Sequence, residues 1–508
     1  MKKFIWKKRF SLPEAIGLIG IAVICVSVVS YAVTVPHTFS SGTTAKSSEV
    51  NANFTALVSA VTALETQVAA LQADLITAEG SITAHDGRLS TVESSNVFLL
   101  DSYLTISSAT TNGLAGPHVI LEGVNLHIRN GGGATSTINA LGNLVVGYNE
   151  DPGDLDPGDR GGSHNFIVGP EHRYLSFGGF VAGLANTVTT LYASVSGGTY
   201  NTASGQYSSV SGGWSSTASG DYSSVSGGYG NEASGIVSSV SGGTYNTANE
   251  SYSSVSGGQG NSANGIFSSV SGGQSNDASG EGSSVSGGAG NTASGVGSSV
   301  SGGAGNTASN FYTGVSGGRD NEASGNYSSV SGGRENTASN QYSSISGGYI
   351  NTAGGRYSSV SGGYLNTAGP GWYSSVSGGD DNTASANYSS VSGGWSNTAS
   401  GWYSSVSGGA SNGATTQYAS VSGGYDNTAS GFASSVTGGI NNTASGGNSN
   451  ISGGSDNTAS SSYSSVSGGY YNEASGYISS VSGGYNHTMS SDYGWMACGT
   501  YTCTDAGP

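Results

Sequence analysis

The chain has 508 residues, 88 of them glycine and only 8% charged, a composition unlike that of conventional globular domains. Its formal net charge of −17, with no basic face beyond the first ten residues, argues against a nucleic-acid partner. Proline is scarce and tyrosine is frequent, unlike in disordered chains, so the composition predicts a repeat fold whose tight turns use glycine.

Residues 1–42 are expected to be an export signal or a membrane anchor. Lysines and Arg9 precede an uncharged apolar run from Ala15 to Val35, and positive charge before such a run stays in the cytoplasm. Ser30-Tyr31-Ala32 fits a signal-peptide cleavage site, while the run is also long enough for an uncleaved anchor. The segment Phe10–Glu14 resembles the start of type IV pilin-like proteins, although Arg9 stands where that family has a small residue. All three interpretations place the rest of the chain outside the cytoplasm, so the membrane is expected to be a partner only through this segment.

Residues 43–100 are predicted to form an α-helical coiled-coil stalk. Apolar side chains recur at alternating steps of four and three residues from Val50 to Leu99. Only a partner helix can bury so narrow a stripe. The mixture of valine and leucine in the stripe does not distinguish two strands from three.

Residues 101–190 are predicted to be a neck of loops and short strands. The apolar triplets Val119–Leu121, Leu144–Val146 and Phe166–Val168 are expected to be the strands. The acidic, proline- and glycine-rich loop Asp151–Asp159 could bind calcium through its carboxylates, but it lacks EF-hand spacing. A solvated loop is the alternative.

Residues 191–497 form the predicted head, in which valine or isoleucine recurs every 15 residues from Val195. Each repeat approximates Val-Ser-Gly-Gly-x-x-Asn-Thr-Ala-Ser-Gly-x-Tyr-Ser-Ser, and one extra residue near Pro370 shifts the frame once. Alternation places valine and alanine inward on two short strands, and glycine ends each strand. The fold class is therefore an all-β repeat head, a parallel β-solenoid of about 20 coils. Representative core residues are Val210, Ala218, Val225, Ala233, Val330 and Ala338.

Two further columns follow from the same repeat. Asparagine lies two residues before the inward alanine, where it can form a hydrogen-bonded ladder that satisfies the turns; examples are Asn291, Asn306, Asn321 and Asn336. Tyrosine lies three residues before the valine in seven consecutive coils, at Tyr327, Tyr342, Tyr357, Tyr373, Tyr388, Tyr403 and Tyr418. This tyrosine ladder points outward and either forms a subunit interface or stacks on itself, or it binds a glycan or a host protein.

The head is expected to associate with copies of itself. One valine and one alanine per coil make a thin core compared with the cost of ordering 15 residues. The stalk already brings chains together. A parallel homotrimer of residues 44–508 satisfies both requirements.

The seven-residue half-repeat, x-x-Asn/Ser-x-Ala/Val-x-Gly, resembles the repeats in the heads of trimeric autotransporter adhesins of the YadA type, known as hemagglutinin-type repeats. The neck segments Gly142–Glu150 and Gly162–Gly169 resemble those that precede such repeats in bacterial surface proteins. The resemblance covers about 370 residues and implies a left-handed β-roll. Those adhesins end in a coiled coil and a membrane β-barrel, whereas this sequence ends at Cys503–Pro508, so anchoring is expected to be N-terminal.

Residues 498–508 are predicted to cap the last coil. Cys25 lies in the apolar export segment, which leaves Cys498 and Cys503 to form a disulfide in an oxidising compartment. The bond would close the open edge of the sheet.

No pattern of catalytic residues is found. The histidines lack metal-ligand spacing, and the serines lack a histidine and an aspartate repeated beside them. The sequence therefore predicts a non-enzymatic protein without metal or cofactor. We expect a bacterial, cell-surface or secreted adhesin that attaches to a glycan, a protein or an abiotic surface, or that builds surface filaments.

Two other functions compete with adhesion. An ice-binding solenoid would need a flat, uncharged threonine array, but here Glu232, Asp277, Glu322 and Glu473 interrupt the threonine column. A receptor-binding protein like a tail fibre is suggested by the segment Gly42–Phe54, which looks like the start of fibre-protein stalks. The export signal argues against a virion component.

Overall fold

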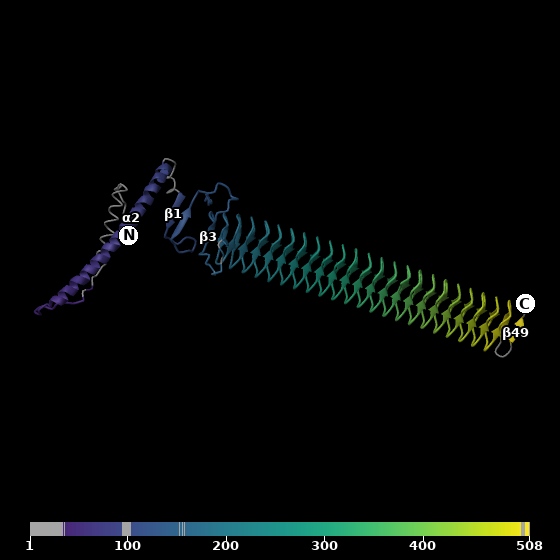
Figure 1. Cartoon of the computed structure of the whole chain (residues 1–508). Helices are drawn as coiled ribbons and strands as arrows, with labels where there is room; N and C mark the ends of the chain where they lie inside the picture. Colours follow the sequence, from purple (N-terminus) through teal and green to yellow (C-terminus); the bar gives the residue numbers. More distant parts are fainter. Residues whose placement is uncertain are drawn as a thin grey trace. The chain divides into compact units, whose positions relative to one another are not determined.

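The computed structural model describes residues 34, 36–93, 103–151, 153–154, 156, 158–498 and 503–506 of the chain (Figure 1). The predicted apolar export run, Ala15 to Val35, lies almost entirely outside the described residues. The chain divides into two compact units, Met1–Leu126 and His127–Pro508.

The described residues of the first unit form one long helix and one hairpin. Helix α2 covers Ser47–Glu93, so the predicted helix is present. Its stretch Ser47–Thr77 is long and apolar enough to cross a membrane by length and composition, which is consistent with a signal or anchor segment. Strands β1 (Leu104–Ser107) and β2 (His118–Leu121) pair antiparallel.

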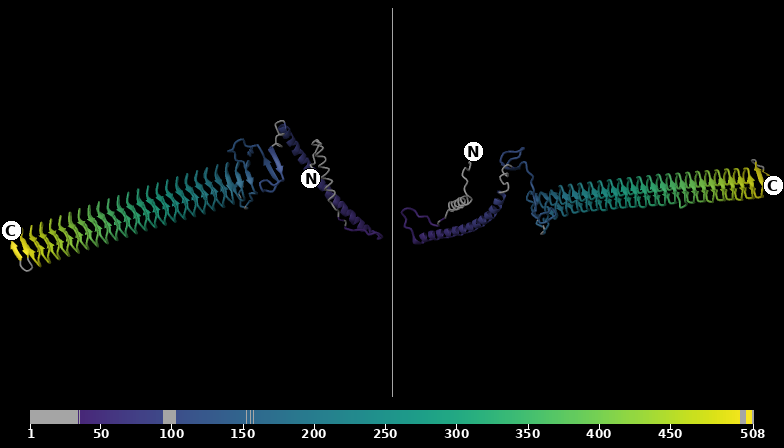
Figure 2. Two further views of the ribbon diagram at one scale, coloured as in Figure 1. Left: turned by 180° about the vertical axis from the view of Figure 1, so that it is seen from behind. Right: turned by 90° about the horizontal axis from the view of Figure 1, so that it is seen from above.

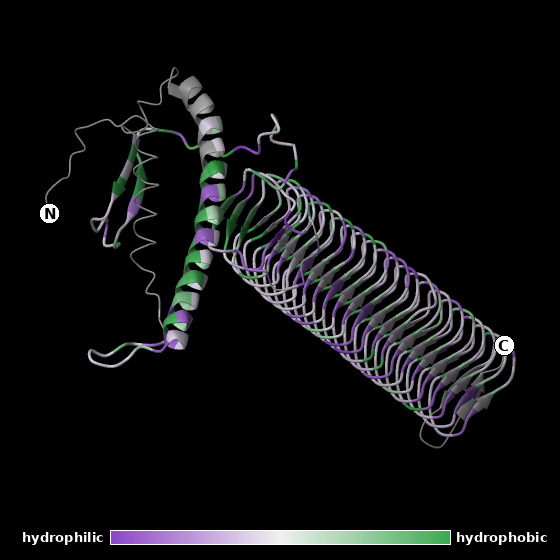
Figure 3. Ribbon diagram, turned by 60° about the vertical axis from the view of Figure 1, so that its left-hand side comes forward, coloured by the Kyte–Doolittle hydropathy of each residue, from purple (hydrophilic) through white to green (hydrophobic). Residues whose placement is uncertain are grey.

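Apolar side chains of α2 that follow the stepping pattern are exposed. Phe54 is 61% exposed, and Leu57, Val61 and Leu71 are exposed as well. Figure 3 shows hydrophobic segments, in green, alternating with hydrophilic ones along the helix. Phe39 lies beside Val50, Phe54 and Leu57 at the start of the helix, but within the described chain no second helix covers the stripe.

The second unit is a parallel β-solenoid of about 22 coils, most of them 15 residues long, and Figure 2 shows the coils stacked in one continuous row. One ladder of strands carries the valines. It starts with β3 (Leu144–Val146), β4 (Phe166–Val168) and β6 (Phe180–Ala182). It continues in the even-numbered strands from β8 (Ser194–Val195) to β46 (Ser480–Val481), each two residues long.

The other ladder carries the alanines. It runs from β5 (Arg173–Tyr174) and β7 (Thr187–Val188) through the odd-numbered strands from β9 (Thr202–Ala203) to β47 (Thr488–Met489). Each strand pairs in register with the equivalent strand of the next coil, as Val210 does with Val225. A third line of single bridges joins the residue four places after each valine, for example Thr199 to Trp214.

The solenoid begins earlier than the predicted head. Because β3 pairs with β4, and β4 with β6, the parallel ladder starts inside the predicted neck, which explains the additional coils. The three short strands expected between residues 101 and 190 are present, as β2, β3 and β4.

The core is a single column closed within one chain. It extends from Ile167 to Met489, with Met496 packed against its end. The predicted core residues all lie in it with at most 1% of their surface exposed: Val210, Ala218, Val225, Ala233, Val330 and Ala338. Since no second chain is needed to cover these side chains, the thinness of the core alone does not require an oligomer.

The second glycine of each Val-Ser-Gly-Gly turn is conformationally required. Gly213 has a φ of +98°, and a Cβ there would collide with the carbonyl oxygen of Gly228 in the next coil. Gly212, by contrast, has open space around it. Only a residue without a side chain allows successive coils to approach this closely.

At the C-terminal end, β48 (Trp495–Cys498) continues the valine ladder parallel to β46, and its other edge meets an antiparallel strand. It pairs with β49 (Cys503–Ala506), and the register places Cys498 opposite Cys503.

Candidate binding surface of the solenoid

The asparagine column is an internal scaffold. In the coil of Asn336, Nδ2 donates to the carbonyl oxygens of Gly332 (3.0 Å) and Gly348 (2.9 Å), and Oδ1 accepts the backbone N–H of Asn351 (2.9 Å). The backbone N–H of Asn336 in turn donates to Oδ1 of Asn321 at 3.0 Å. The predicted Asn291, Asn306, Asn321 and Asn336 all lie in this column and are buried. A buried column cannot contact a ligand, so its function is structural.

A second buried polar column was not identified from the sequence. In most coils the residue two before the valine is a buried serine. In some coils its hydroxyl bonds to the turn that precedes it, as Ser343 does in donating to the carbonyl oxygen of Asn340 at 2.7 Å, whereas in others, such as Ser208 and Ser283, the hydroxyl has no hydrogen-bond partner in the described part of the chain. The period-2 alternation of the strand contained this signal, because a residue two before an inward valine must also face inward.

The tyrosine ladder is a continuous face-to-face stack. Consecutive rings from Tyr327 to Tyr418 have centroids 4.7 to 5.2 Å apart and interplanar angles of 3° to 14°. Tyr312 extends the stack by one ring at 5.5 Å. At these centroid distances nearly parallel rings stack with an offset, so each ring covers part of the face of the next one.

Each ladder tyrosine has a left-handed backbone. For example, φ is 57° at Tyr342 and 60° at Tyr403. This conformation costs a residue with a side chain roughly 1–2 kcal/mol, whereas an aromatic pair gains about 0.5–1.5 kcal/mol. The stacking thus approximately offsets the backbone strain, so the ladder adds little net stability.

An outer column lies beside the tyrosine ladder, formed by the residue that precedes each tyrosine position. Over five coils, beginning with the sixteen-residue coil, it alternates between aromatic and amide side chains, and we keep the name outer column for these residues: Trp372, Asn387, Trp402, Gln417 and Phe432. The three aromatic residues are 50–57% exposed, while the two amides are half-buried. Alignment of the repeats in 15-residue rows would have revealed this alternation.

Contacts within the outer column are few. Oδ1 of Asn387 accepts the backbone N–H of Trp372 at 2.7 Å, which leaves its amide NH₂ group without a protein partner among the described residues. The Arg356 guanidinium lies over the rings of Tyr357 (5.1 Å) and Trp372 (5.4 Å) at one end of the column. Within the described chain, the indole of Trp402 has no ring or cation contact. At the other end Phe432 stands edge-on to Tyr418, with ring centroids 5.7 Å apart.

The two sheet faces present mostly hydroxyl groups. On the valine ladder, the residues on either side of each valine from Val195 to Val481 are serine with rare Gly, Thr or Asn, and none is charged. On the alanine ladder the outward column is mainly threonine, and it is interrupted by acidic residues as the sequence indicates.

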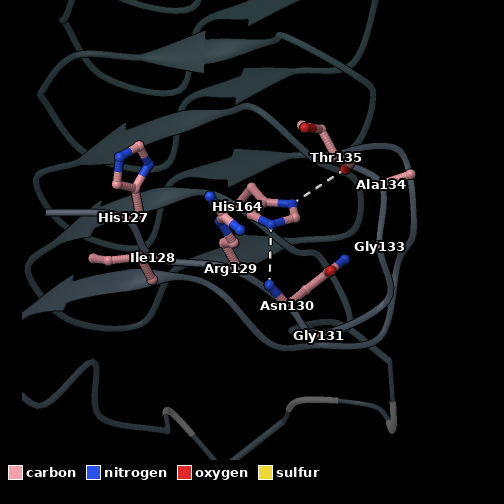
Figure 4. A pocket seen from close by; sticks show the side chains of 9 residues that line it. All are labelled: His127, Ile128, Arg129, Asn130, Gly131, Gly133, Ala134, Thr135 and His164. Carbon is pink, nitrogen blue, oxygen red and sulfur yellow. Dashed lines mark hydrogen bonds between the residues drawn. The ribbon is translucent and has the colours of Figure 1, made fainter. Parts of the chain in front are cut away.

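A cavity of about 520 Å³ lies near the start of the solenoid, lined by His127, Arg129, the loop Asn130–Thr135 and His164 (Figure 4). The Nε2 atom of His164 accepts the backbone N–H of Asn130 at 3.1 Å, and Nδ1 lies 3.1 Å from the carbonyl oxygen of Thr135. Both ring nitrogens therefore hold the loop, which is a structural function.

The acidic neck loop forms ion pairs with an arginine. Arg173 contacts Asp154 at 2.8 Å and Asp159 at 3.2 Å, so two of the carboxylates expected as calcium ligands already have a partner. Across the described ranges, no three His, Cys, Asp or Glu side chains converge as metal ligands would.

His172 is the fully buried histidine of the first coils. Burial lowers its pKa below the ordinary value. Its Nδ1 accepts the backbone N–H of Asn186 at 3.2 Å, and its Nε2 lies 2.9 Å from the carbonyl oxygen of Val168. The ring thus takes the place of an asparagine in the ladder.

We define the aromatic ridge as the tyrosine ladder together with the outer column, and it is one exposed surface that can meet a partner. Exposed aromatic side chains also lie on the third line of single bridges, for example Trp214, Trp395 and Tyr425. Cys498 and Cys503 lie opposite each other at the backbone level, at the C-terminal end. No protein-family model matches the sequence, and no curated protein is found to be similar to it.

Proposed function

We propose that this chain is an exported, fibrous, adhesin-like protein of the bacterial surface, which mediates attachment or builds surface filaments. The observation that carries the proposal is the aromatic ridge, an uninterrupted line of exposed aromatic side chains from Tyr312 to Phe432 on a rigid solenoid. Large exposed aromatic surfaces on otherwise polar proteins mark interaction sites. A stacked solenoid holds such a surface far from its point of attachment.

Three parallel chains are the proposed assembly, with α2 as a coiled coil and the head as a left-handed β-roll. The exposed apolar stripe of α2 supports a helical partner. Glu65 and Asp74 lie in the same helix, and carboxylates at membrane depth are costly, which favours a water-exposed coiled coil over a membrane span for this stretch. Export and anchoring are then assigned to residues 1–42.

The proposal is tested with protein secreted from a bacterial host. Light scattering should give three times the monomer mass. Beads coated with the protein should be retained on polysaccharide films, cells or glass more strongly than beads coated with albumin. A stable monomer would contradict the trimer, and retention no better than albumin on every surface would contradict the attachment function.

A second candidate, ice binding, is favoured by one observation: the serine columns of the valine ladder contain no charge from Ser194 to Ser482. Serine lacks the methyl group of threonine, which weakens this candidate. Thermal hysteresis of the purified protein distinguishes the two, since an adhesin should leave ice growth unchanged.

A further inference from the structure

We propose that the outer column is a binding site for a linear, neutral polysaccharide, in which Trp372 and Trp402 stack on sugar rings and Asn387 donates hydrogen bonds between them. This inference rests on the proposed attachment function and names the class of its ligand. It differs from a glycan site on the tyrosine ladder, because the ring faces there are partly covered by the neighbouring rings.

Sugar recognition by aromatic residues needs a free ring face, since the C–H groups of a pyranose pack on the π-face. In the tyrosine ladder consecutive ring centroids are 4.7 to 5.2 Å apart with nearly parallel planes, so neighbouring rings occupy part of each face. Trp402, in contrast, is 57% exposed and has no ring contact in the described part of the chain. The stacked tyrosines therefore serve as a rigid support beside which the tryptophans project.

The pairing of the valine strands sets the spacing between residues of the outer column. Trp372, Asn387 and Trp402 each lie four residues before a valine, and those valines pair in register in β32 (Ser375–Val376), β34 (Ser390–Val391) and β36 (Ser405–Val406). Adjacent parallel strands are about 4.8 Å apart, so the two indoles are about 9.6 Å apart along the axis. This is close to the length of one disaccharide in an extended β-1,4-linked chain, in which every second ring presents the same face.

The side chain between the two tryptophans can donate hydrogen bonds to sugar hydroxyl groups. The amide NH₂ group of Asn387 is free to donate, because only its oxygen is bonded to the backbone of Trp372. Gln417 repeats the amide one coil beyond Trp402. A protein partner would favour a continuous apolar surface, whereas here each aromatic residue is separated from the next by an amide.

The charges of the column and of the whole chain favour a neutral polysaccharide over a charged one. No acidic or basic residue occurs in the outer column from Trp372 to Phe432, and the net charge of −17 repels polyanions such as uronate or sulfated chains. At one end of the column the Arg356 guanidinium lies over the ring of Tyr357 and over one face of the Trp372 indole. Trp372 therefore offers a sugar only its other face, which has no ring or cation contact in the described part of the chain.

The test compares two double variants of the full-length protein. The variant W372A/W402A lacks both indole rings that are proposed to stack on sugars. In the control I236A/I266A, two exposed isoleucines are removed from the equivalent positions, also two coils apart. Hydroxyethylcellulose, xylan and chitohexaose are the probes, and dextran is the linkage control. Affinity is measured by calorimetry and by the shift of tryptophan emission.

We expect the wild type and I236A/I266A to bind at least one β-1,4-linked probe more tightly than dextran. W372A/W402A should bind it about a hundredfold more weakly, as is usual for the loss of two aromatic anchors. The three proteins should share one unfolding temperature, which excludes misfolding as the cause.

Two results would overturn the polysaccharide site. One is equal affinity of W372A/W402A and wild type for the β-1,4-linked probes, and the other is absence of binding by the wild type. Bead retention is measured in parallel with all three proteins. If wild-type beads are retained although the protein binds no polysaccharide, the attachment function still holds and the polysaccharide is rejected as its ligand. If W372A/W402A then also loses retention, the outer column binds a protein partner or a second copy of the chain.

Discussion

Individual residues of the repeat have separate physical functions. Valine and alanine fill the core, the second glycine permits the left-handed turn, and asparagine connects each coil to the next through its amide. The amide is the least replaceable of these side chains, because it is buried and donates as well as accepts. In one coil Ser216 replaces the asparagine, and its hydroxyl oxygen accepts the backbone N–H of Asn231 at 3.4 Å.

Asn336→Ala should open the solenoid locally. The backbone N–H of Asn351 would lose its acceptor and the carbonyl oxygen of Gly332 its donor. Two buried groups left unsatisfied cost about 2–4 kcal/mol. Hydrogen exchange of the flanking coils should accelerate correspondingly. Thr337→Ala, an outward change on the same strand, is the matched control and should leave exchange unchanged.

His172 should make the first coils sensitive to acid. Burial lowers its folded-state pKa, so the folded protein binds the proton less readily than the unfolded chain does. The neutral, buried His172 ring contributes its full stability at pH values above the pKa of histidine in the unfolded chain, about 6.5. This contribution decreases as the pH falls below that value. Protection factors near Asn186 should therefore fall between pH 7.5 and 5.

The control for this pH dependence is His172→Asn, which restores the ladder residue without a titratable group. It should abolish the acid sensitivity. If this variant loses protection as steeply as the wild type, another group is responsible.

Replacement of four ladder tyrosines by serine tests the balance between ring stacking and backbone strain. The variant Y357S/Y373S/Y388S/Y403S loses the stacking but keeps side chains in left-handed conformations. It should unfold at a lower temperature than the corresponding glycine variant, which is free of that strain. Gly282 and Gly297 occupy the same column in the native chain. Loss of bead retention with unchanged unfolding would instead identify the ladder as a contact surface.

At the scale of elements, most strands of the solenoid are only two residues long and gain stability solely from the coils on either side. Both ends of the ladders therefore need protection. Strand β49 covers the last strand of the valine ladder by pairing antiparallel with β48. An uncovered edge would invite pairing with other chains.

A Cys498–Cys503 disulfide should lock this hairpin. The two cysteines are directly opposite in the register, which is the arrangement that a cross-strand bridge requires. Peptide mapping of the exported protein should recover the two cysteines in one linked peptide, and C498S/C503S should accelerate hydrogen exchange in the last coils. Recovery of both cysteines as alkylated thiols without reductant would refute the bond.

The sequence predicts elements well where one rule repeats. The 15-residue period specified the Val210 and Ala218 columns, the turns and the asparagine ladder, because each position recurs many times. It was less informative in the neck, where β3 and β4 are separated by a long loop and the parallel pairing cannot be seen from a period. The stacking of the tyrosines and the accessibility of Trp402 could not be deduced, because both depend on side-chain rotamers.

For the whole molecule, coil number sets length. Each coil contacts only its neighbours, so removal of one complete repeat should bring equivalent residues into register again. Deletion of residues 256–270 should leave a folded protein that is shorter by about 4.8 Å. Deletion of residues 256–263, which is about half a repeat, should place alanines of the later coils in the valine column of the earlier coils and disrupt folding. Small-angle scattering and circular dichroism measure both results, and equal folding of the two variants would contradict register control.

The sixteen-residue coil has a consequence for how such a gene can change. Asn366 and Asn382 are 16 residues apart, yet they form the same 3.0 Å hydrogen bond as their neighbours, since the extra residue is accommodated in the turn at Pro370. Insertions of a single codon at turns therefore leave the columns intact. Unequal exchange between near-identical repeats of 15 codons adds or removes whole coils without loss of reading frame. Descendants of one gene can thus differ in the reach of the protein while they retain the same valine, alanine, glycine and asparagine columns.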